Sequence, residues 1–266
     1  SLESNRFCFG SEMKALWAAG ESRDPNLFLL YNFLTLGYSQ NPLDPGETFY
    51  RKIRKLPARH FLLYQAASRS CSIHPYWDIN PVRSISISDG EAIEQFSYLL
   101  KDSVRKRLRS DVPVGSSLSG GLDSSSIVAL CASPADGRFN QEVFTAGFPG
   151  FALDETSSAS QIAAKHQLKH HICQPGAEDL VSLFPELVHH QEEPFLSGST
   201  LAQFMVYRLA RDHQVKVLLD GQGADEALAG QRAGARLRGA RRADDARRCH
   251  GADRRRARHG QQRLRP

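Results

Sequence analysis

An acidic residue stands inside a glycine- and serine-rich turn that otherwise has the composition of an anion-binding loop. The stretch SLSGGLDSSSIVAL runs from residue 117 to residue 130. A turn of this kind between a strand and a helix points several backbone N–H groups at one spot, where the helix dipole adds positive charge. Glycines let the backbone approach an anion closely, and serines add hydroxyl donors. Asp123 does not serve that purpose unless a divalent cation accompanies the anion.

A magnesium-bound polyphosphate accounts for both the turn and its carboxylate. Mg²⁺ binds oxygen ligands, usually one or two carboxylates together with phosphates. The stretch lacks GxxxxGK[ST], which excludes a Walker-type loop, and it lacks GxGxxG, which argues against a dinucleotide turn. We therefore predict that Asp123 is a metal ligand. The residues predicted to bind the magnesium-bound polyphosphate are Ser117, Leu118, Ser119, Gly120, Gly121, Asp123, Ser124 and Ser125.

A second acidic cluster, LLDGQGADE at 218–226, also follows an expected strand. Ligands of open parallel sheets bind outside the carboxyl ends of the strands, so this loop and the first are expected to face one nucleotide. Asp225 then partners Asp123 as the second magnesium ligand, and Glu226 either orients it or holds a basic group. The alternative is a surface helix that Asp225 merely caps.

The elements that must position these loops alternate between strand and helix. Strands are expected at 112–118, 142–148, 170–175 and 215–220, and helices at 124–132, 154–167, 177–190 and 199–213. This alternation with apolar strands predicts an α/β fold in which helices cover both faces of a parallel sheet. An amphipathic helix is expected at 91–109, with Asp89 as its cap and with one stripe formed by Ile93, Phe96, Leu100, Val104 and Leu108.

Three polar features of these elements carry specific expectations. Ser116 and Ser117 stand where a buried strand favours apolar residues, and each hydroxyl left unpaired would cost about 1–3 kcal/mol. His170 and His171 begin an expected strand and are assigned no chemistry beyond solvation or hydrogen bonding. Residues 1–80 read as mixed strands and turns with a helix that Gly37 ends.

The composition is that of a globular protein with a distinct basic tail. Hydrophobic residues make up 41% and charged residues 24% of the 266 positions. The five cysteines form no CxxC pair, which favours reduced thiols in a cytoplasmic protein. Residues 231–266 hold 13 Arg, no Lys and 3 Asp, so this tail accounts for the net charge of +5. Its few apolar residues predict disorder. Its Arg-, Ala- and Gly-rich composition without Lys is what out-of-frame translation of GC-rich DNA gives, and no nucleic-acid partner is expected.

The loop SGGLDSS resembles the pyrophosphate-binding loop of ATP pyrophosphatase domains, which cleave ATP to AMP and pyrophosphate. The surrounding sequence is similar to glutamine-hydrolysing asparagine synthetases over about residues 5–230. The matching stretches are FCFGSEMKAL, TLGYSQNPLDPGETFYRKIRKLPARHFLLY, HPYWDI, SDVPVG, HHQEEPF and LLDGQGADE. The resemblance implies a Rossmann-like ATP pyrophosphatase domain at 91–230. It implies that the C-terminal remnant of an α+β glutaminase domain at 1–80 and a linker at 81–90 precede that domain.

The resemblance also implies roles for single residues. Ala146 is expected to contact the adenine through its backbone, and Asp220 and Gly221 are expected to contact ATP. Gln222 stands where some members carry a glutamate linked to formation of the acyl-adenylate, which leaves its role open. The candidate catalytic residues are therefore Asp225, Glu226 and Gln222. The stretch HHQEEPF, at 189–195, is expected near the amino-acid substrate.

The reaction implied is the conversion of aspartate to asparagine through a β-aspartyl-adenylate. It uses ATP, Mg²⁺ and ammonia from glutamine, and it releases AMP and pyrophosphate. The family's N-terminal cysteine nucleophile is expected upstream of Ser1, and Cys8 is not that residue, so the chain is expected to be inactive alone. Two alternatives stay open: a related amide-forming ligase of the β-lactam synthetase kind, or a non-catalytic remnant that holds ATP. A homo-oligomer also stays open, and no membrane association is expected.

Overall fold

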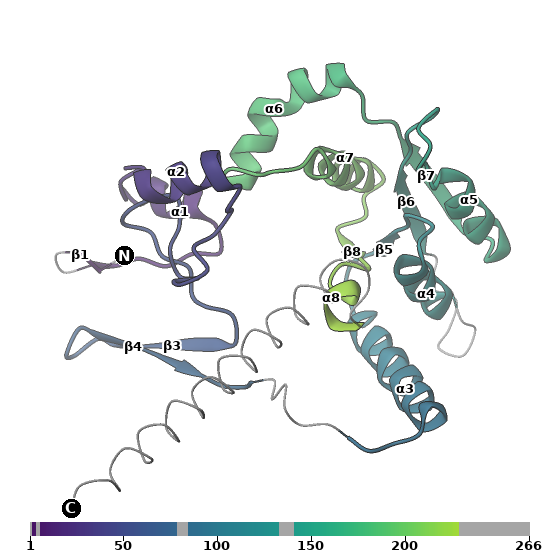
Figure 1. Cartoon of the computed structure of the whole chain (residues 1–266), viewed down its shortest axis with the longest axis horizontal. Coiled ribbons are helices and arrows are strands. Elements are labelled where there is room, and N and C mark those ends of the chain that lie inside the picture. The colour runs from purple at the N-terminus through teal and green to yellow at the C-terminus, as the bar shows by residue number, and fades with distance from the viewer. Residues whose placement is uncertain (1, 4–5, 79–84, 133–140, 229–266) are drawn as a thin grey trace, which may run out of the picture. The chain divides into compact units, whose positions relative to one another are not determined.

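A four-stranded sheet positions the two loops that the sequence singles out (Figure 1). Its strand order is β7–β6–β5–β8, with bounds Lys169–Cys173, Glu142–Ala146, Val114–Ser117 and Val217–Leu219. β5 pairs in parallel with both neighbours, so that Ser116 lies opposite Val143 on one side and Leu219 on the other. Helices separate these strands along the chain, which confirms the predicted α/β fold.

The structure is a computed structural model that describes residues 2–3, 6–78, 85–132 and 141–228. The predicted tail at 231–266 lies outside these residues, and so do residues 81–84 of the predicted linker. Contacts divide the chain into two compact units, and each is described by itself. The first comprises Ser1–Leu100, Ala146–Pro149 and Cys173–Leu209, and the second comprises Lys101–Thr145, Gly150–Ile172 and Ala210–Pro266.

Helices α4 and α5 bury one face of the sheet in the second unit. α4 spans Leu122–Cys131 and α5 spans Thr156–Lys165. Their apolar residues pack with the strands in one cluster of Leu118, Val128, Val143, Ala159 and Ala163. The end of α3 (Asp89–Arg107) and the residue after it join a second cluster, which consists of Val104, Leu108, Val114 and Cys131. The short helix α8 (Ala224–Leu228) follows β8.

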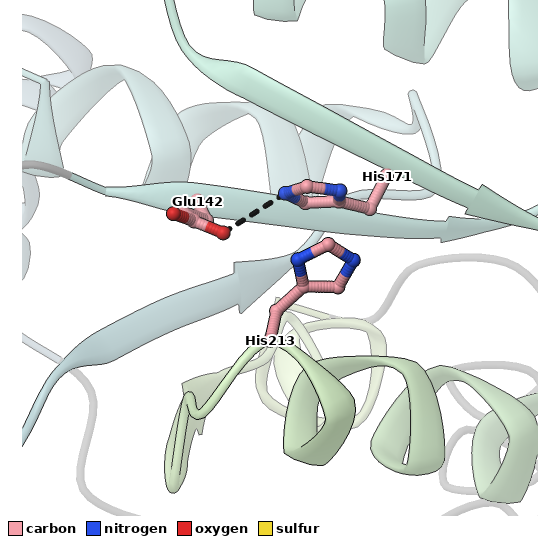
Figure 2. A group of neighbouring side chains, drawn as sticks. All are labelled: Glu142, His171 and His213. Atoms are coloured by element: carbon pink, nitrogen blue, oxygen red, sulfur yellow. Dashed lines mark hydrogen bonds and ion pairs between the residues drawn. The ribbon is translucent and has the colours of Figure 1, made fainter.

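Alternation along β6 and β7 sends neighbouring side chains to opposite faces of the sheet. His170 contacts the α5 side, where its Nδ1 lies 3.4 Å from the Ser160 hydroxyl. His171 lies on the other face, where its Nε2 donates to Glu142 at 2.9 Å (Figure 2). Burial on its own raises the pKa of Glu142, but hydrogen bonds from Lys169 and His171 hold that pKa below its ordinary value. Both histidines are thus hydrogen-bonded, as the sequence predicted.

The first unit combines the N-terminal segment with part of the chain that follows β7. It contains the short strands β1 (Leu2–Glu3) and β2 (Arg6–Phe7), helices α1 (Met13–Ala18) and α2 (Leu27–Leu36), and the antiparallel hairpin of β3 (His60–Gln65) and β4 (Ser70–Pro75). It also contains α6 (Ala177–Gln191) and most of α7 (Ser199–Asp212). Gly37 ends α2 in the left-handed conformation, at φ 70°, as predicted.

Several local predictions need correction. Ser88, not Asp89, caps α3: its hydroxyl accepts from the Glu91 amide at 3.3 Å, and the Glu91 carboxylate accepts from the Ser88 amide at 2.9 Å. The expected stripe of α3 is buried only toward its end, because Ile93 is 66% exposed whereas Val104 is 6% exposed. The sequence does not locate strand β4 within residues 1–80, since its polar stretch SCSIHP lacks a clear alternation.

The described residues contain neither a disulfide nor a helix suited to span a membrane. Among the described residues, Cys8, Cys71, Cys131 and Cys173 do not form disulfides. Burial raises the pKa of the Cys131 thiol to about 11, which keeps it protonated at neutral pH. Within the described ranges, no helix combines the length and the apolar character that crossing a membrane requires.

Candidate functional site

The strand order places a topological switch point between β5 and β8. The chain proceeds from β5 to β6 and then to β7 on one side, and it returns to the other side of β5 for β8. In open parallel sheets, ligands bind outside the carboxyl ends of the strands at such a point. The loops that follow β5 and β8 are the two that the sequence predicts as nucleotide-binding.

Gly221 brings these two loops into direct contact. A Cβ atom added to Gly221 would lie 2.9 Å from the Ser124 amide nitrogen and 3.2 Å from the Asp123 Cβ. Only a residue without a side chain fits this position without movement, because real Cβ atoms do not approach a backbone nitrogen so closely. The close approach therefore brings the loop after β8 against the first turn of α4.

The first loop is held together by its own serines. The Ser124 hydroxyl accepts from the Ser119 amide at 3.2 Å, and the two hydroxyls lie 3.0 Å apart. The Ser119 hydroxyl accepts from the Gly121 amide at 3.2 Å, and Ser125 donates its hydroxyl proton to the Gly121 carbonyl at 2.5 Å. The side chains of the loop thus fix its backbone, and the proton of the Ser125 hydroxyl is already in use.

The N-terminus of α4 offers amide groups and a carboxylate with no partner of their own. No side chain caps this ten-residue helix at Gly121, and the first turn of any helix leaves its N–H groups without intrahelical acceptors. The Asp123 side chain is half-buried, and it makes no hydrogen bond or ion pair with any residue that the structure describes. Uncapped amides and an unpaired carboxylate at one helix start fit an anion that arrives with a cation.

An unpaired hydroxyl lies at the start of the same loop. The Ser117 Oγ atom is buried and has no hydrogen-bond partner among the described residues, whereas the neighbouring Ser116 hydroxyl accepts from the Gln141 side chain. The cost predicted for unpaired strand hydroxyls therefore applies to Ser117 alone, at about 1–3 kcal/mol. A buried donor left without a partner fits a place where a bound ligand supplies one.

Two contacts on the α5 side hold the loop backbone in place. The Thr145 hydroxyl donates to the Leu118 carbonyl at 2.5 Å, and the His170 Nε2 atom lies 2.8 Å from the same hydroxyl. Because Thr145 already donates its proton, His170 must donate at Nε2. Burial, and then the neighbouring His171, lower the pKa of His170, which favours the neutral ring that this arrangement uses. Gly120 adopts φ +89°, and a Cβ there would lie 2.8 Å from the Ala159 amide nitrogen.

For the other predicted site residues, the structure gives mainly the element and the burial. Asp220 is half-buried directly after β8, while Gln222 and Asp225 are exposed. Glu226 belongs to α8, but its side chain lies outside the described part. Ala146 ends β6, is half-buried and belongs to the first unit. The pairing of Asp123 with Asp225 around one magnesium ion therefore stays a prediction.

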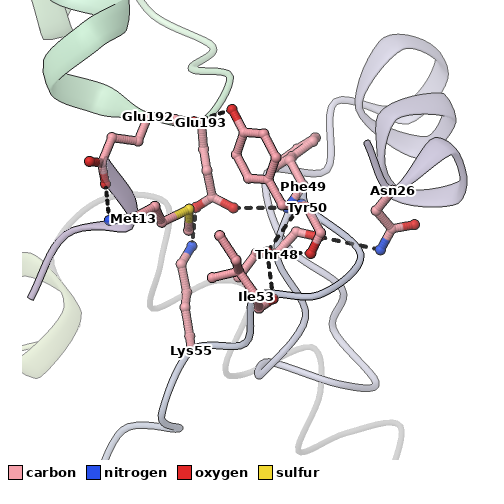
Figure 3. Close-up of polar contacts among 9 residues, drawn as sticks. All are labelled: Met13, Asn26, Thr48, Phe49, Tyr50, Ile53, Lys55, Glu192 and Glu193. Carbon is pink, nitrogen blue, oxygen red and sulfur yellow. Dashed lines mark hydrogen bonds and ion pairs between the residues drawn. The ribbon is translucent and has the colours of Figure 1, made fainter. Parts of the chain in front are cut away.

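Two glutamates of HHQEEPF make contacts in the first unit that the sequence did not predict (Figure 3). The Glu192 carboxylate accepts from the Met13 amide at 2.7 Å. It also accepts from the Lys14 amide at 2.8 Å and from the Lys14 side chain at 2.9 Å. Glu193 accepts from the Phe49 amide at 3.0 Å and from the Lys55 side chain. These carboxylates fasten the N-terminal segment to the residues after α6. The adjacent acids Glu192 and Glu193 are visible in the sequence, but their hydrogen-bond partners lie far away along the chain.

Replacing Glu192 by Gln should destabilise the first unit by about 1–3 kcal/mol, since three partly buried donors would lose a charged acceptor. The side chain is 9% exposed, so solvent screens this loss little. The change in the free energy of unfolding is measured by urea titration with tryptophan fluorescence, because Trp17 lies 4.9 Å from Tyr50 in the same unit. The matched control is Glu186→Gln, whose carboxylate is 41% exposed beside Arg208 and should cost about 0–1 kcal/mol.

The same carboxylate predicts a pH dependence of stability. Burial alone would raise the pKa of Glu192, but the hydrogen bonds from Lys14 and Met13 together hold it below the ordinary value of 4.5. A carboxyl with a depressed pKa contributes stability that is fully present above the unfolded pKa and is lost as the pH falls through the folded pKa. The gap between wild type and Glu192→Gln should therefore be constant above about pH 5 and shrink below pH 4.5. A gap that grows on acidification would contradict this assignment.

Comparison with known proteins gives consistent matches. The family model for asparagine synthase matches residues 95–265. A Methanocaldococcus jannaschii protein named putative asparagine synthetase [glutamine-hydrolyzing] 2 is 31% identical over 227 residues, which is 84% of this chain and 42% of that protein. A Mycobacterium bovis protein named putative asparagine synthetase [glutamine-hydrolyzing] is 34% identical over 205 residues, 74% of this chain and 29% of that protein. The chain thus spans less than half the length of either relative.

A solved structure also matches part of the chain. It is an NH3-dependent NAD synthetase from Campylobacter jejuni, with a TM-score of 0.36 and 16% sequence identity. The match covers 52% of this chain and 60% of that one.

Proposed function

The chain belongs to the asparagine synthase family, and on that basis we propose that it carries the ATP-binding part of an enzyme that converts aspartate to asparagine. In the proposed reaction, a side-chain carboxylate oxygen of aspartate attacks the α-phosphate of ATP. Pyrophosphate leaves, and a β-aspartyl-adenylate remains. Ammonia from glutamine then attacks the acyl carbon, loses a proton, and displaces AMP.

One observation carries the proposal: Gly221 lies against Asp123 and Ser124 at the switch point of the sheet. A Cβ on Gly221 would come within 2.9 Å of the Ser124 amide nitrogen. The contact places the loop after β8 beside uncapped amides of α4. These are the two loops that a nucleotide at this switch point would need to touch. The Ser117 hydroxyl and the Asp123 carboxylate, which have no partner within the described part of the chain, support the same assignment.

The residues of the two loops have distinct proposed roles. The amides at the start of α4 bind the phosphates that leave as pyrophosphate, and the dipole of α4 stabilises their charge. Asp123 and Asp225 would hold Mg²⁺, which, when bound, stabilises negative charge on the phosphates. Asp220 and Gly221 contact the nucleotide, and the Ala146 backbone contacts the adenine. Gln222 and Glu226 lie close in sequence to Asp225 and are the other candidate catalytic residues: Glu226 would orient Asp225 or hold a basic group, and the role of Gln222 stays open.

Pyrophosphate release from the full chain tests this proposal directly. The chain is incubated with Mg²⁺, ATP and aspartate, and ammonium chloride replaces glutamine as the source of ammonia. We expect the chain to bind ATP and to form no asparagine from glutamine. If ammonium chloride bypasses the glutaminase cysteine that is expected upstream of Ser1, pyrophosphate, AMP and asparagine should appear in equal amounts and only with aspartate. ATP binding by calorimetry is measured in parallel. A chain that binds no ATP would refute the proposal.

A second candidate is amide formation on a different acid. A Penicillium rubens relative, 27% identical over 199 residues, is named amidase chyE, so related chains carry different names for their chemistry. The two candidates differ in which carboxylic acid triggers pyrophosphate release. Release with another carboxylic acid but not with aspartate would favour the second candidate. Tight ATP binding without release for any acid would favour a non-catalytic ATP-binding chain.

A further inference from the structure

Three side chains of metal-binding type meet on the sheet face opposite α4 and α5 (Figure 2). The Glu142 Oε2 and His171 Nε2 atoms are 2.9 Å apart. The rings of His171 and His213 lie 3.7 Å apart between centroids. One ligand atom from each of Glu142, His171 and His213 lies within 4.8 Å of the other two. In Figure 2 a nitrogen of each ring is on the side toward the carboxylate.

The three residues come from separate segments of the second unit. Glu142 is the first residue of β6, His171 lies in the middle of β7, and His213 follows α7 and precedes β8. β6 and β8 both run parallel to β5, so the segments before them lie at the amino ends of the strands, and the nucleotide loops lie at the carboxyl ends. The cluster is therefore distinct from the proposed nucleotide site, and a ligand bound to it would not depend on that site.

An ordinary ion pair explains only part of this arrangement. Glu142 and His171 would form their hydrogen bond without His213, and among the described residues His213 makes ring contacts to His171 and Phe144 but no hydrogen bond. Stacking brings the second imidazole to the first but does not require its nitrogen to face the same carboxylate. Two imidazoles and a carboxylate directed at one point are a frequent ligand set of zinc.

We infer that Glu142, His171 and His213 bind a divalent ion of the zinc class, with water at a fourth position. Zinc bonds of 2.0–2.1 Å to nitrogen place tetrahedral ligand atoms about 3.3 Å apart. The present separations, from 2.9 Å to at most 4.8 Å, bracket that value, so small side-chain rotations close the site. The ion replaces the proton between His171 and Glu142, and His171 then carries its proton on Nδ1.

Lys169 supports the site instead of blocking it. Its Nζ atom lies 3.0 Å from Oε1 of Glu142, which leaves Oε2 for the ion. A partner of this kind orients a ligating carboxylate. A bound ion would join the start of β6, the edge strand β7 and the turn before β8. The site is therefore expected to stabilise the second unit.

Metal titration of the full chain tests the inference, with Zn²⁺ for affinity and Co²⁺ for its visible spectrum. Wild type should bind one more equivalent of Zn²⁺ than His213→Ala or Glu142→Gln, or should bind it at least about tenfold more tightly. The Co²⁺ complex should show tetrahedral bands in the visible region that both variants lose. His213 is exposed, so His213→Ala should fold, and circular dichroism verifies this.

The matched control replaces His189 and His190, another pair of histidines whose rings are in contact. The rings of His189 and His190 lie 5.5 Å apart on exposed positions of α6, and His189→Ala/His190→Ala should leave the stoichiometry and the Co²⁺ spectrum unchanged. Identical binding by wild type, His213→Ala and Glu142→Gln would overturn the inference. So would a thiolate charge-transfer band, since it would assign the ion to a cysteine, or loss of the ion in the control alone.

Discussion

Replacing Asp123 by Asn should weaken binding of magnesium-bound ATP by about 100-fold, the scale expected when a charged ligand group is lost. The side chain is half-buried and has no partner among the described residues, so no fold-stabilising contact disappears with its charge. The free energy of unfolding should therefore fall only by the lost interaction of the carboxylate with the α4 dipole, about 0.3–1 kcal/mol. Calorimetric titration with ATP measures the first effect, and thermal unfolding measures the second.

The magnesium dependence separates a metal ligand from a residue that merely shapes the loop. Wild type should lose affinity for ATP when EDTA removes Mg²⁺, whereas Asp123→Asn should lose most of this dependence and keep only the part that Asp225 supports. Asp89→Asn is the control, because Asp89 also lies in the first turn of a helix and is exposed. An Asp123→Asn chain that keeps the full Mg²⁺ dependence of wild type would show that Asp123 is not a ligand.

The sequence predicted the alternating elements of the second unit because their signals are local. Strands β6 and β8 carry apolar residues directly before a turn, and α5 shows the periodicity of a helix with one apolar face. Burial of the α3 stripe could not be predicted in this way, since it depends on which elements pack against the helix. Ile93 and Val104 are equivalent by spacing, yet only Val104 has core partners. Ser88 caps α3 through two reciprocal hydrogen bonds with Glu91. A search for a single capping residue, which favours Asp89, does not detect such a pair.

Contacts between distant segments were beyond a reading along the chain. HHQEEPF stands out in the sequence by its paired acids. Their role as hydrogen-bond acceptors depends on Met13, 179 residues from Glu192, and on Phe49, 144 residues from Glu193. His171 and His213 show the same limit, because 42 residues separate them in sequence and no spacing rule connects them. The two nucleotide loops were linked in advance only because a rule of topology, the carboxyl ends of parallel strands, applies to both.

Replacing Gly221 by Ala should weaken ATP binding at least about tenfold and destabilise the chain by about 1–3 kcal/mol, as overpacking does. The new methyl group would lie 2.9 Å from the Ser124 amide nitrogen, so either the loop after β8 or the start of α4 must move. The methyl group would also cover an amide that is proposed to bind phosphate. Because Gly221 does not have a positive φ, backbone strain does not contribute to the loss.

A comparison of glycines separates this contact from a general effect of adding a methyl group. Gly198 also lacks a positive φ, and a Cβ there meets nothing within 4 Å, so Gly198→Ala should change neither ATP affinity nor stability measurably. Gly223 has open space but φ +94°, so Gly223→Ala should cost backbone strain without the contact. If Gly221→Ala behaved like Gly198→Ala in both measurements, the two loops would not meet at this point. The nucleotide site built on their contact would then have to be abandoned.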